Sequence, residues 1–331
     1  PAANPAAAAA TARWRRPRDT GCMKLLAICT TIAISAGCGD PAPATPNVDA
    51  AVQPTGDAGD AGVPGADLVA ARPYDLFVPT GLPASTPAPL IVLLHGYGAS
   101  GELQATYFNL RTAAQDSGVL VALPDGLVDG IGRRFWNATD ACCNFSGNPV
   151  DDVAYLTAVI DDVAARHAVD PARVYLVGHS NGGFMAHRMA CDRSNRIAAI
   201  VSLAGATWNT AATCAPSEPV AVLQIHGDAD TTIRYAGGAI GTTAYPSAAT
   251  TVKTWADLNG CTGPLENTGV RLDLDLPKVG ADTRVERFRD CPGAGADVEL
   301  WTIEGGGHSP TFRHPAWSAA LVGFLLAHPK P

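Results

Sequence analysis

The chain has 331 residues, and its 31 acidic against 23 basic side chains give a formal net charge of −8. An acidic chain lacks the clustered positive charge with which proteins bind nucleic acid or anionic membranes. The length suits one large domain with appendages or two small domains, and no apolar run reaches the roughly 20 residues of a membrane-spanning helix.

The first 37 residues predict an export signal rather than part of a folded domain. Residues 1–22 show no core pattern and are interpreted as an upstream translation product. From Met23, a basic start, an apolar run of about ten residues and small residues follow, in the order of a secretory signal peptide. The ending Ala36-Gly37-Cys38 resembles bacterial lipoprotein signals, in which the cysteine is lipidated. We therefore expect an extracellular protein with Cys38 as the candidate lipid anchor; free secretion and a cytoplasmic protein with an unusual start are the alternatives.

Residues 38–67 predict a flexible tether. They are rich in Pro, Ala, Gly and Asp and almost lack large apolar side chains. Such a segment cannot bury a core. The folded domain is therefore expected over residues 68–331, with the membrane reached only through the lipid.

Short apolar runs and helical patterns alternate from residue 68 onward. Pro- or Gly-bounded apolar runs are typical of strands buried on both faces of a parallel sheet. Such strands are predicted at 90–94, 119–123, 173–177, 197–203, 220–225 and 298–303, with an antiparallel edge strand at 74–78. Helices are predicted at 151–167, 182–190, 250–259 and 315–327. This alternation predicts a single-domain α/β fold with a mostly parallel central sheet flanked by helices.

The segment Gly178-His179-Ser180-Asn181-Gly182 carries the clearest chemical signal. It follows a predicted strand and opens a predicted helix, which is the setting of a nucleophile elbow. The turn is so tight that small residues must flank the serine. We therefore predict that Ser180 is a catalytic nucleophile; a serine that only caps the helix is the alternative.

A serine nucleophile needs a base, and the base needs an orienting carboxylate. In this arrangement the chain order is Ser, then acid, then His. The strand at 220–225 is followed by Asp228 and Asp230, and the strand at 298–303 by three glycines and His308. His308 is the predicted base, while the residues alone leave both aspartates open as the acid.

The tetrahedral intermediate of acyl transfer requires an oxyanion hole. One predicted donor is the backbone N–H of Asn181, directly after the nucleophile. The other is the backbone N–H of Tyr97, in the loop after the strand at 90–94, where Gly96 lets the backbone approach. A plain strand-to-helix turn is the alternative for this loop.

Six of the nine cysteines lie in the body of the chain: Cys142, Cys143, Cys191, Cys214, Cys261 and Cys291. An even number in an exported protein indicates disulfides. Local bridges would join Cys191 to Cys214 and Cys261 to Cys291, which leaves the neighbours Cys142 and Cys143 to a vicinal bridge. Cross-pairing among all six cysteines stays open. No cysteine or histidine cluster has metal-ligand spacing, so no metal is expected.

Seven segments in one collinear order carry a family resemblance: LLHGYG, WNATDACC, VDDVAYLTAVIDD, DPARVYLVGHSNGG, IHGDAD, WADLNGC and GGGH. Across roughly residues 70–328 the chain resembles the exported esterases that include feruloyl esterases and polyhydroxybutyrate depolymerase-like proteins. The resemblance implies an α/β-hydrolase fold with a Ser-Asp-His triad and neither metal nor organic cofactor. The family's H-G-x-x-D pattern falls on Asp230, its nucleophile on Ser180 and its base on His308.

Two segments depart from the family pattern beside the expected cleft. The early loop has Tyr97 where the family often has Cys, and Ser309 stands where a Trp often follows the catalytic His. His95, His179 and Trp136 are candidate cleft residues, with core packing as the alternative for Trp136.

The sequence therefore predicts a secreted, monomeric serine esterase. Its preferred substrate is a hydroxycinnamoyl (feruloyl) ester on plant-wall polysaccharide such as xylan. A depolymerase of polyhydroxybutyrate or related polyesters is the first alternative. A peptidase and a non-catalytic surface binding protein are the less favoured ones.

Overall fold

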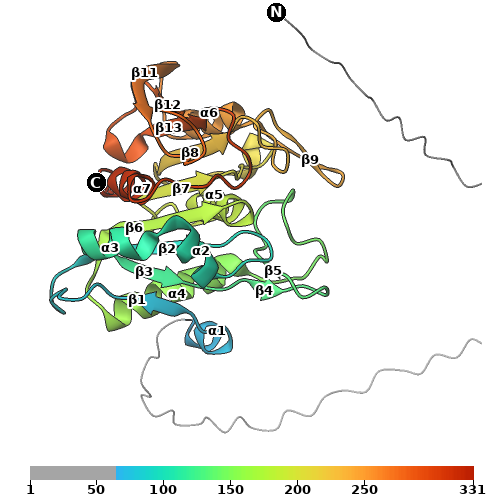
Figure 1. The fold of residues 1–331 in the computed structure, drawn as a ribbon. Helices are drawn as coiled ribbons and strands as arrows, with labels where there is room; N and C mark the ends of the chain where they lie inside the picture. Colours follow the sequence, from blue (N-terminus) through green and yellow to red (C-terminus); the bar gives the residue numbers. More distant parts are fainter. Residues whose placement is uncertain (1–64) are drawn as a thin grey trace, which may run out of the picture. The chain divides into compact units, whose positions relative to one another are not determined.

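The computed structural model describes residues 65–331, so the predicted signal segment, Cys38 and most of the predicted tether lie outside the described residues. Within the described range the chain forms a nine-stranded sheet with the strand order β1-β3-β2-β6-β7-β8-β13-β12-β11 (Figure 1). The boundary expected at residue 68 falls inside the first helix, α1 (Ala66–Ala71).

Six neighbouring strands of this sheet run parallel, and most of their side chains are buried. They are β2 (Ala88–Leu94), β3 (Leu120–Leu123), β6 (Val169–His179), β7 (Ala199–Leu203), β8 (Ala221–Gly227) and β13 (Val298–Ile303). Helices cover both faces, so each strand needs apolar side chains on both sides. The predicted fold class and the six predicted central strands are confirmed.

The two edges of the sheet are antiparallel. At one edge β1 (Asp75–Phe77) pairs with β3, as predicted for residues 74–78. At the other edge β12 (Thr283–Phe288) and β11 (Leu265–Leu272) extend the sheet as a hairpin. The sequence did not predict this hairpin, because β11 is largely exposed and lacks an apolar run.

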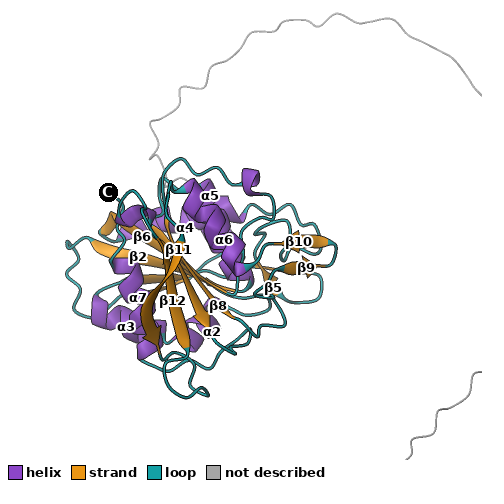
Figure 2. Cartoon of the chain, turned by 90° about the horizontal axis from the view of Figure 1, so that it is seen from above, coloured by secondary structure: helices purple, strands orange, loops and turns teal. Residues whose placement is uncertain are grey.

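Helices form a layer on each face of the sheet (Figures 1 and 2). One layer contains α4 (Asp152–Arg166), α5 (Asn181–Asp192) and α6 (Ala248–Leu258), which bury Leu156, Phe184 and Trp255 against the strands. The other contains α2 (Gly101–Phe108), α3 (Leu110–Ser117) and α7 (Ala316–Leu326), which bury Phe108, Leu110 and Trp317. The predictions for α4 to α7 are confirmed, whereas α1 to α3 were not predicted. Among the described residues, no helix is both long and apolar enough to span a membrane.

The parallel strands end at one common edge, where functional loops of α/β sheets gather. Two short hairpins lie on this side, to the right in Figure 1: β4 (Leu127–Val128) with β5 (Arg134–Phe135), and β9 (Gly238–Ile240) with β10 (Thr243–Tyr245). Both follow central strands in the chain. They therefore flank the edge at which the predicted site residues meet.

All six body cysteines are paired in the structure. Cys191 bonds Cys214, Cys261 bonds Cys291, and the neighbours Cys142 and Cys143 bond each other. This is the pairing with two local bridges and one vicinal bridge, not the cross-pairing that the sequence left open.

Candidate active site

Ser180 occupies the sharp turn between β6 and α5. Its φ of 55° and ψ of −120° lie outside the regions that non-glycine residues prefer. A Cβ on Gly178 would come within 2.1 Å of the Gly182 carbonyl oxygen, and one on Gly182 within 2.1 Å of the Leu94 carbonyl oxygen. Only glycine fits at both positions, so the G-x-S-x-G spacing follows from the shape of the turn.

The structure brings Ser180, His308 and Asp230 into one hydrogen-bonded line. His308 Nε2 lies 3.0 Å from Ser180 Oγ, and His308 Nδ1 lies 2.7 Å from Asp230 Oδ2. The carboxylate can only accept, so Nδ1 carries the proton and donates it. Nε2 is then left as an acceptor for the serine hydroxyl, which is the arrangement a general base needs.

Asp230 is buried but well supplied with donors. Its Oδ1 accepts the backbone N–H groups of Thr232 at 2.7 Å and Ile233 at 3.0 Å. Burial alone would raise the pKa of Asp230, but hydrogen bonds from His226 and His308 outweigh it and hold the pKa well below its usual range. The carboxylate is therefore ionised throughout the neutral range.

The geometry also separates the two aspartates that the residues alone left open. Asp228 is exposed, and its Oδ1 accepts the Gly305 N–H at 2.6 Å. It therefore supports the glycine loop that leads to His308 without contacting the imidazole.

The two predicted oxyanion donors lie on either side of Ser180. Asn181 is the first residue of α5, and the first N–H groups of a helix have no partner inside it. Tyr97 follows Gly96, on which a Cβ would lie 3.5 Å from Ser180 Cβ. Within the described part of the chain, no backbone acceptor is found for the Tyr97 N–H. The α5 N-terminus adds a partial positive charge at the same place.

His95 and Trp136 do not line a cleft, which corrects that expectation for both. Each side chain is 0% exposed. His95 Nδ1 donates to the Gly96 carbonyl at 2.8 Å, its Nε2 accepts from Gly126 N–H at 2.9 Å, and Trp136 Nε1 donates to the His95 carbonyl at 3.0 Å. These bonds use the polar atoms of both side chains, so the two residues support the Tyr97 loop from the core side.

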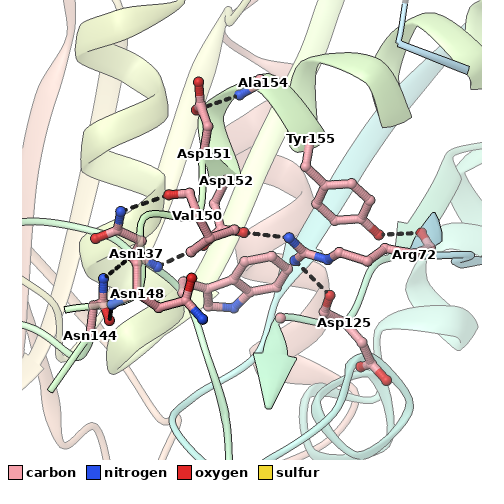
Figure 3. Close-up of polar contacts among 12 residues, drawn as sticks. Arg72, Asp125, Asn137, Asn144, Asn148, Val150, Asp151, Asp152, Ala154 and Tyr155 are labelled. Atoms are coloured by element: carbon pink, nitrogen blue, oxygen red, sulfur yellow. Dashed lines mark hydrogen bonds and ion pairs between the residues drawn. The ribbon is translucent and has the colours of Figure 1, made fainter. Parts of the chain in front are cut away.

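Trp136 is also tied to the nucleophile turn and to an ionic network. Its backbone N–H donates to Asn181 Oδ1 at 2.7 Å, and its carbonyl accepts from Asn181 Nδ2 at 3.0 Å. The next residue, Asn137, donates its N–H to buried Asp152 at 2.7 Å, and Asp152 also accepts from Arg72 at 2.7 Å (Figure 3). The loop after Trp136 therefore starts from a firmly held point.

The rest of the same loop is pinned at its return to α4 (Figure 3). Asn137 Nδ2 donates to the Val150 carbonyl at 2.8 Å, and Asn144 and Asn148 bond each other. We call residues 138–149 the disulfide loop, because they contain the vicinal bridge.

His179 is almost fully buried, and burial lowers its pKa to about 4. Its Nε2 lies 3.0 Å from the His308 carbonyl oxygen, so Nε2 carries the proton and donates. The side chain also lines a hollow of about 260 Å³ together with Tyr107 and Ser309. Of the three candidate cleft residues, His179 is thus the one that borders an open space beside His308.

The sequence did not predict the exposed aromatic surface that Phe145 forms with Tyr97. Phe145, in the disulfide loop, is 62% exposed, and its ring meets that of Tyr97 edge-on at 5.4 Å between centroids. The Tyr97 hydroxyl donates to Asp129, and Arg133 lies over the ring at 5.6 Å. The only sequence signal was Phe145 itself, two residues beyond the cysteine pair.

A larger hollow of about 580 Å³ lies between β11–β13 and α7 and contains no residue of the triad.

No three histidine, cysteine or acidic side chains gather as a metal site in the described residues. The groups that the structure brings together at the sheet edge are the Ser180 hydroxyl, the His308 imidazole and the Asp230 carboxylate.

Comparisons with known proteins agree with the fold. Residues 89–236 match the model of the alpha/beta hydrolase fold. The chain is 31% identical over 247 residues to "Putative esterase NocK" of Nocardia uniformis subsp. tsuyamanensis, covering 72% of this chain and 70% of that protein. It is 29% identical over 240 residues to Feruloyl esterase B of Piromyces equi, covering 70% of this chain but 41% of that protein. The solved acetyl xylan esterase from Aspergillus awamori shares the fold, with a TM-score of 0.51, 18% identity and coverage of 75% of this chain and 93% of that one.

Proposed function

This chain belongs to the α/β-hydrolase esterases that include the feruloyl esterases, and we propose that it cleaves carboxylic esters through an acyl-enzyme on Ser180. The observation that carries the proposal is the line of two hydrogen bonds from Ser180 through His308 to Asp230. Membership of the family makes the chain a carboxylic ester hydrolase. The line of hydrogen bonds supports the residue roles within it.

In the proposed reaction, His308 Nε2 takes the hydroxyl proton while Ser180 Oγ bonds to the ester carbonyl carbon. The carbonyl oxygen becomes an oxyanion held by the N–H groups of Asn181 and Tyr97. His308 then gives the proton to the leaving alkoxide, which departs as the alcohol. A water molecule repeats the sequence on the acyl-enzyme and releases the acid, while Asp230 stabilises the imidazolium at each stage.

We favour hydroxycinnamoyl esters of polysaccharides such as xylan as the substrate class. Relatives named feruloyl esterase align with most of the folded domain. The exposed Phe145 ring beside Tyr97 offers a surface on which an aromatic acyl group can rest, and Tyr97 also carries one of the two oxyanion donors. We further propose that the protein is exported and works as a monomer, with Cys38 as its lipid attachment site; the three disulfides suit an oxidising compartment.

The test is a substrate panel with one matched variant. Purified protein is assayed on methyl ferulate, p-nitrophenyl acetate and polyhydroxybutyrate emulsion, beside Ser180→Ala. We expect the highest kcat/KM on methyl ferulate and a loss of kcat on the order of 10⁶-fold in the variant. Preferred turnover of the polyester would move the substrate class to polyhydroxyalkanoates. Ester hydrolysis by Ser180→Ala at the wild-type rate would refute the mechanism.

A further inference from the structure

A hydrogen-bonded chain of buried side chains runs through the core toward Asp230. Trp255 Nε1, on α6, lies 2.9 Å from His187 Nδ1, on α5. His187 Nε2 lies 3.0 Å from Gln224 Oε1, and Gln224 Nε2 lies 3.3 Å from His226 Nδ1; both of these last residues are on β8. None of the four side chains is more than 1% exposed. We call these four residues the buried relay.

The direction of every hydrogen bond in the buried relay is determined by its neighbours. The Trp255 indole can only donate, so His187 accepts on Nδ1 and donates from Nε2. The Gly205 carbonyl can only accept, and it lies 2.9 Å from Gln224 Nε2, so this atom is the amide nitrogen. Its second N–H then points to His226 Nδ1, which leaves His226 with its proton on Nε2.

That proton is directed at the turn that holds Asp230. His226 Nε2 lies 2.7 Å from the Ile233 carbonyl oxygen and 3.4 Å from Asp230 Oδ2. The N–H of the same Ile233 donates to Asp230 Oδ1 at 3.0 Å. His226 therefore touches the carboxylate directly and also through the residue that bonds its other oxygen.

Such a network costs more free energy to bury than apolar packing would. Two imidazoles and a carboxamide in a sheet core lose their hydration, and apolar residues of the same size would fill the space at no such cost. Every polar atom of Gln224 that can bond does so, and burial lowers the pKa of His187 to about 4, so His187 stays neutral at neutral pH. The four residues are thus arranged to present one fixed N–H, that of His226 Nε2, beside Asp230.

We propose that the buried relay positions Asp230: His226 holds the carboxylate against His308, and Gln224, His187 and Trp255 keep His226 in the tautomer that donates. This inference rests on the proposed triad. Without the N–H of His226 the carboxylate would be a stronger base and would stabilise protonated His308 more. The pH at which the base becomes available would then rise.

The experiment compares His226→Leu, which removes both ring nitrogens, with His226→Gln, whose amide keeps a donor near Nε2. For His226→Leu we expect kcat/KM to fall about tenfold to hundredfold, the range for one hydrogen bond to a charged group, with KM unchanged. The acid limb of the pH profile should move to higher pH. The downfield proton resonance of His308 Nδ1 should also shift. His226→Gln should recover most of the activity and the wild-type profile.

Trp255→Phe removes only the first donor and should shift the pH profile in the same direction by less. Thr251→Val, on the same helix and equally buried but outside the relay, is its control and should match wild type. If His226→Leu does not fold, the contrast between these two variants decides the question. A folded His226→Leu with the wild-type profile and resonance, or Trp255→Phe identical to Thr251→Val, would overturn the proposal. Activity in Ser180→Ala would instead refute the triad, while the resonance would still report whether His226 reaches Asp230.

Discussion

Two buried polar networks support the candidate site, and they are built from different chemistry. The buried relay consists of neutral groups and ends on Asp230. The network under the disulfide loop is centred on an ion pair, Arg72 with Asp152, and ends on Asn137 and the start of α4 (Figure 3). The network next to the proton-transfer groups ends in one N–H that points at the turn holding Asp230. The network that only holds a loop can use the stronger attraction of opposite charges.

The largest loss of activity is expected at Asp230, where the neutral network meets the triad. Asp230→Asn keeps the size of the side chain but offers an N–H to His308, which favours the wrong tautomer. We expect kcat to fall on the order of 10⁴-fold, with the thermal midpoint nearly unchanged. Steady-state kinetics and thermal unfolding check both values. Asp228→Asn is the control, since its amide oxygen can still accept the Gly305 N–H; an equal loss in that variant would contradict the assignment.

The ionic network should show the opposite balance of effects. Asp152→Ala leaves Arg72 and the Asn137 N–H without their buried acceptor, and breaking a buried pair costs about 3–5 kcal/mol of stability. Urea unfolding should show this loss, while kcat/KM at 25 °C stays near that of the wild type. Asp257→Ala, which breaks the exposed pair with Lys253, should cost below about 1 kcal/mol. A folded Asp152→Ala protein with a kcat loss as large as that of Asp230→Asn would erase the distinction.

The neutral network should make the stability of the domain sensitive to mild acid. His187 has a folded pKa of about 4, below the value of about 6.5 in an unfolded chain. The unfolded state therefore binds more protons as pH falls through 6.5 toward 4, and stability falls with it. Linkage gives a loss of about 2 kcal/mol between pH 7 and pH 5 for this histidine, and His179 adds a similar loss.

Urea unfolding at pH 7 and pH 5 measures this loss. His187→Gln should be less stable at pH 7 but should lose only about half as much stability on acidification, because one of the two histidines is gone. An unchanged difference between the two pH values would show that His187 is not kept neutral by the fold.

The smallest predicted effect concerns Phe145, in the disulfide loop that the ionic network supports. Phe145→Ala removes the exposed ring that meets Tyr97, and an aromatic contact of this kind contributes about 0.5–1.5 kcal/mol. KM for methyl ferulate should rise several-fold, while KM for p-nitrophenyl acetate stays constant. Equal changes for both esters would mean that Phe145 supports the loop instead of contacting an aromatic acyl group.

The central sheet could be predicted because its strands are buried on both faces and therefore appear as continuous apolar runs. The hairpin β11–β12 could not, since β11 faces solvent over most of its length. The helices α2 and α3 are only eight residues each and are separated by Asn109 in a left-handed conformation, so no long helical stripe exists in the sequence. Local pattern thus predicts what lies inside the sheet better than what lies around it.

The same distinction applies to the site. Ser180, Asp230 and His308 follow strand ends, and parallel strands bring their ends together, so chain order was enough to propose Ser180 and His308. It left Asp228 and Asp230 open as the acid, and only the family pattern favoured Asp230. His95 also follows the end of a parallel strand, β2, yet it is fully buried, as is Trp136 after β5. Gln224 and His187 carried no signal at all, because their role depends on which face of a strand and of a helix meet across the interior.

The double hydrogen bond between Asn181 and Trp136 has a consequence for protein engineering. It joins the first residue of the nucleophile helix to Trp136, two positions before the disulfide loop begins, while Asn137 and Asp152 tie that loop back to α4. The loop is therefore a replaceable cassette with anchored ends. Libraries that vary residues 144–148 and keep both anchors should change ester preference while the turnover machinery stays in register.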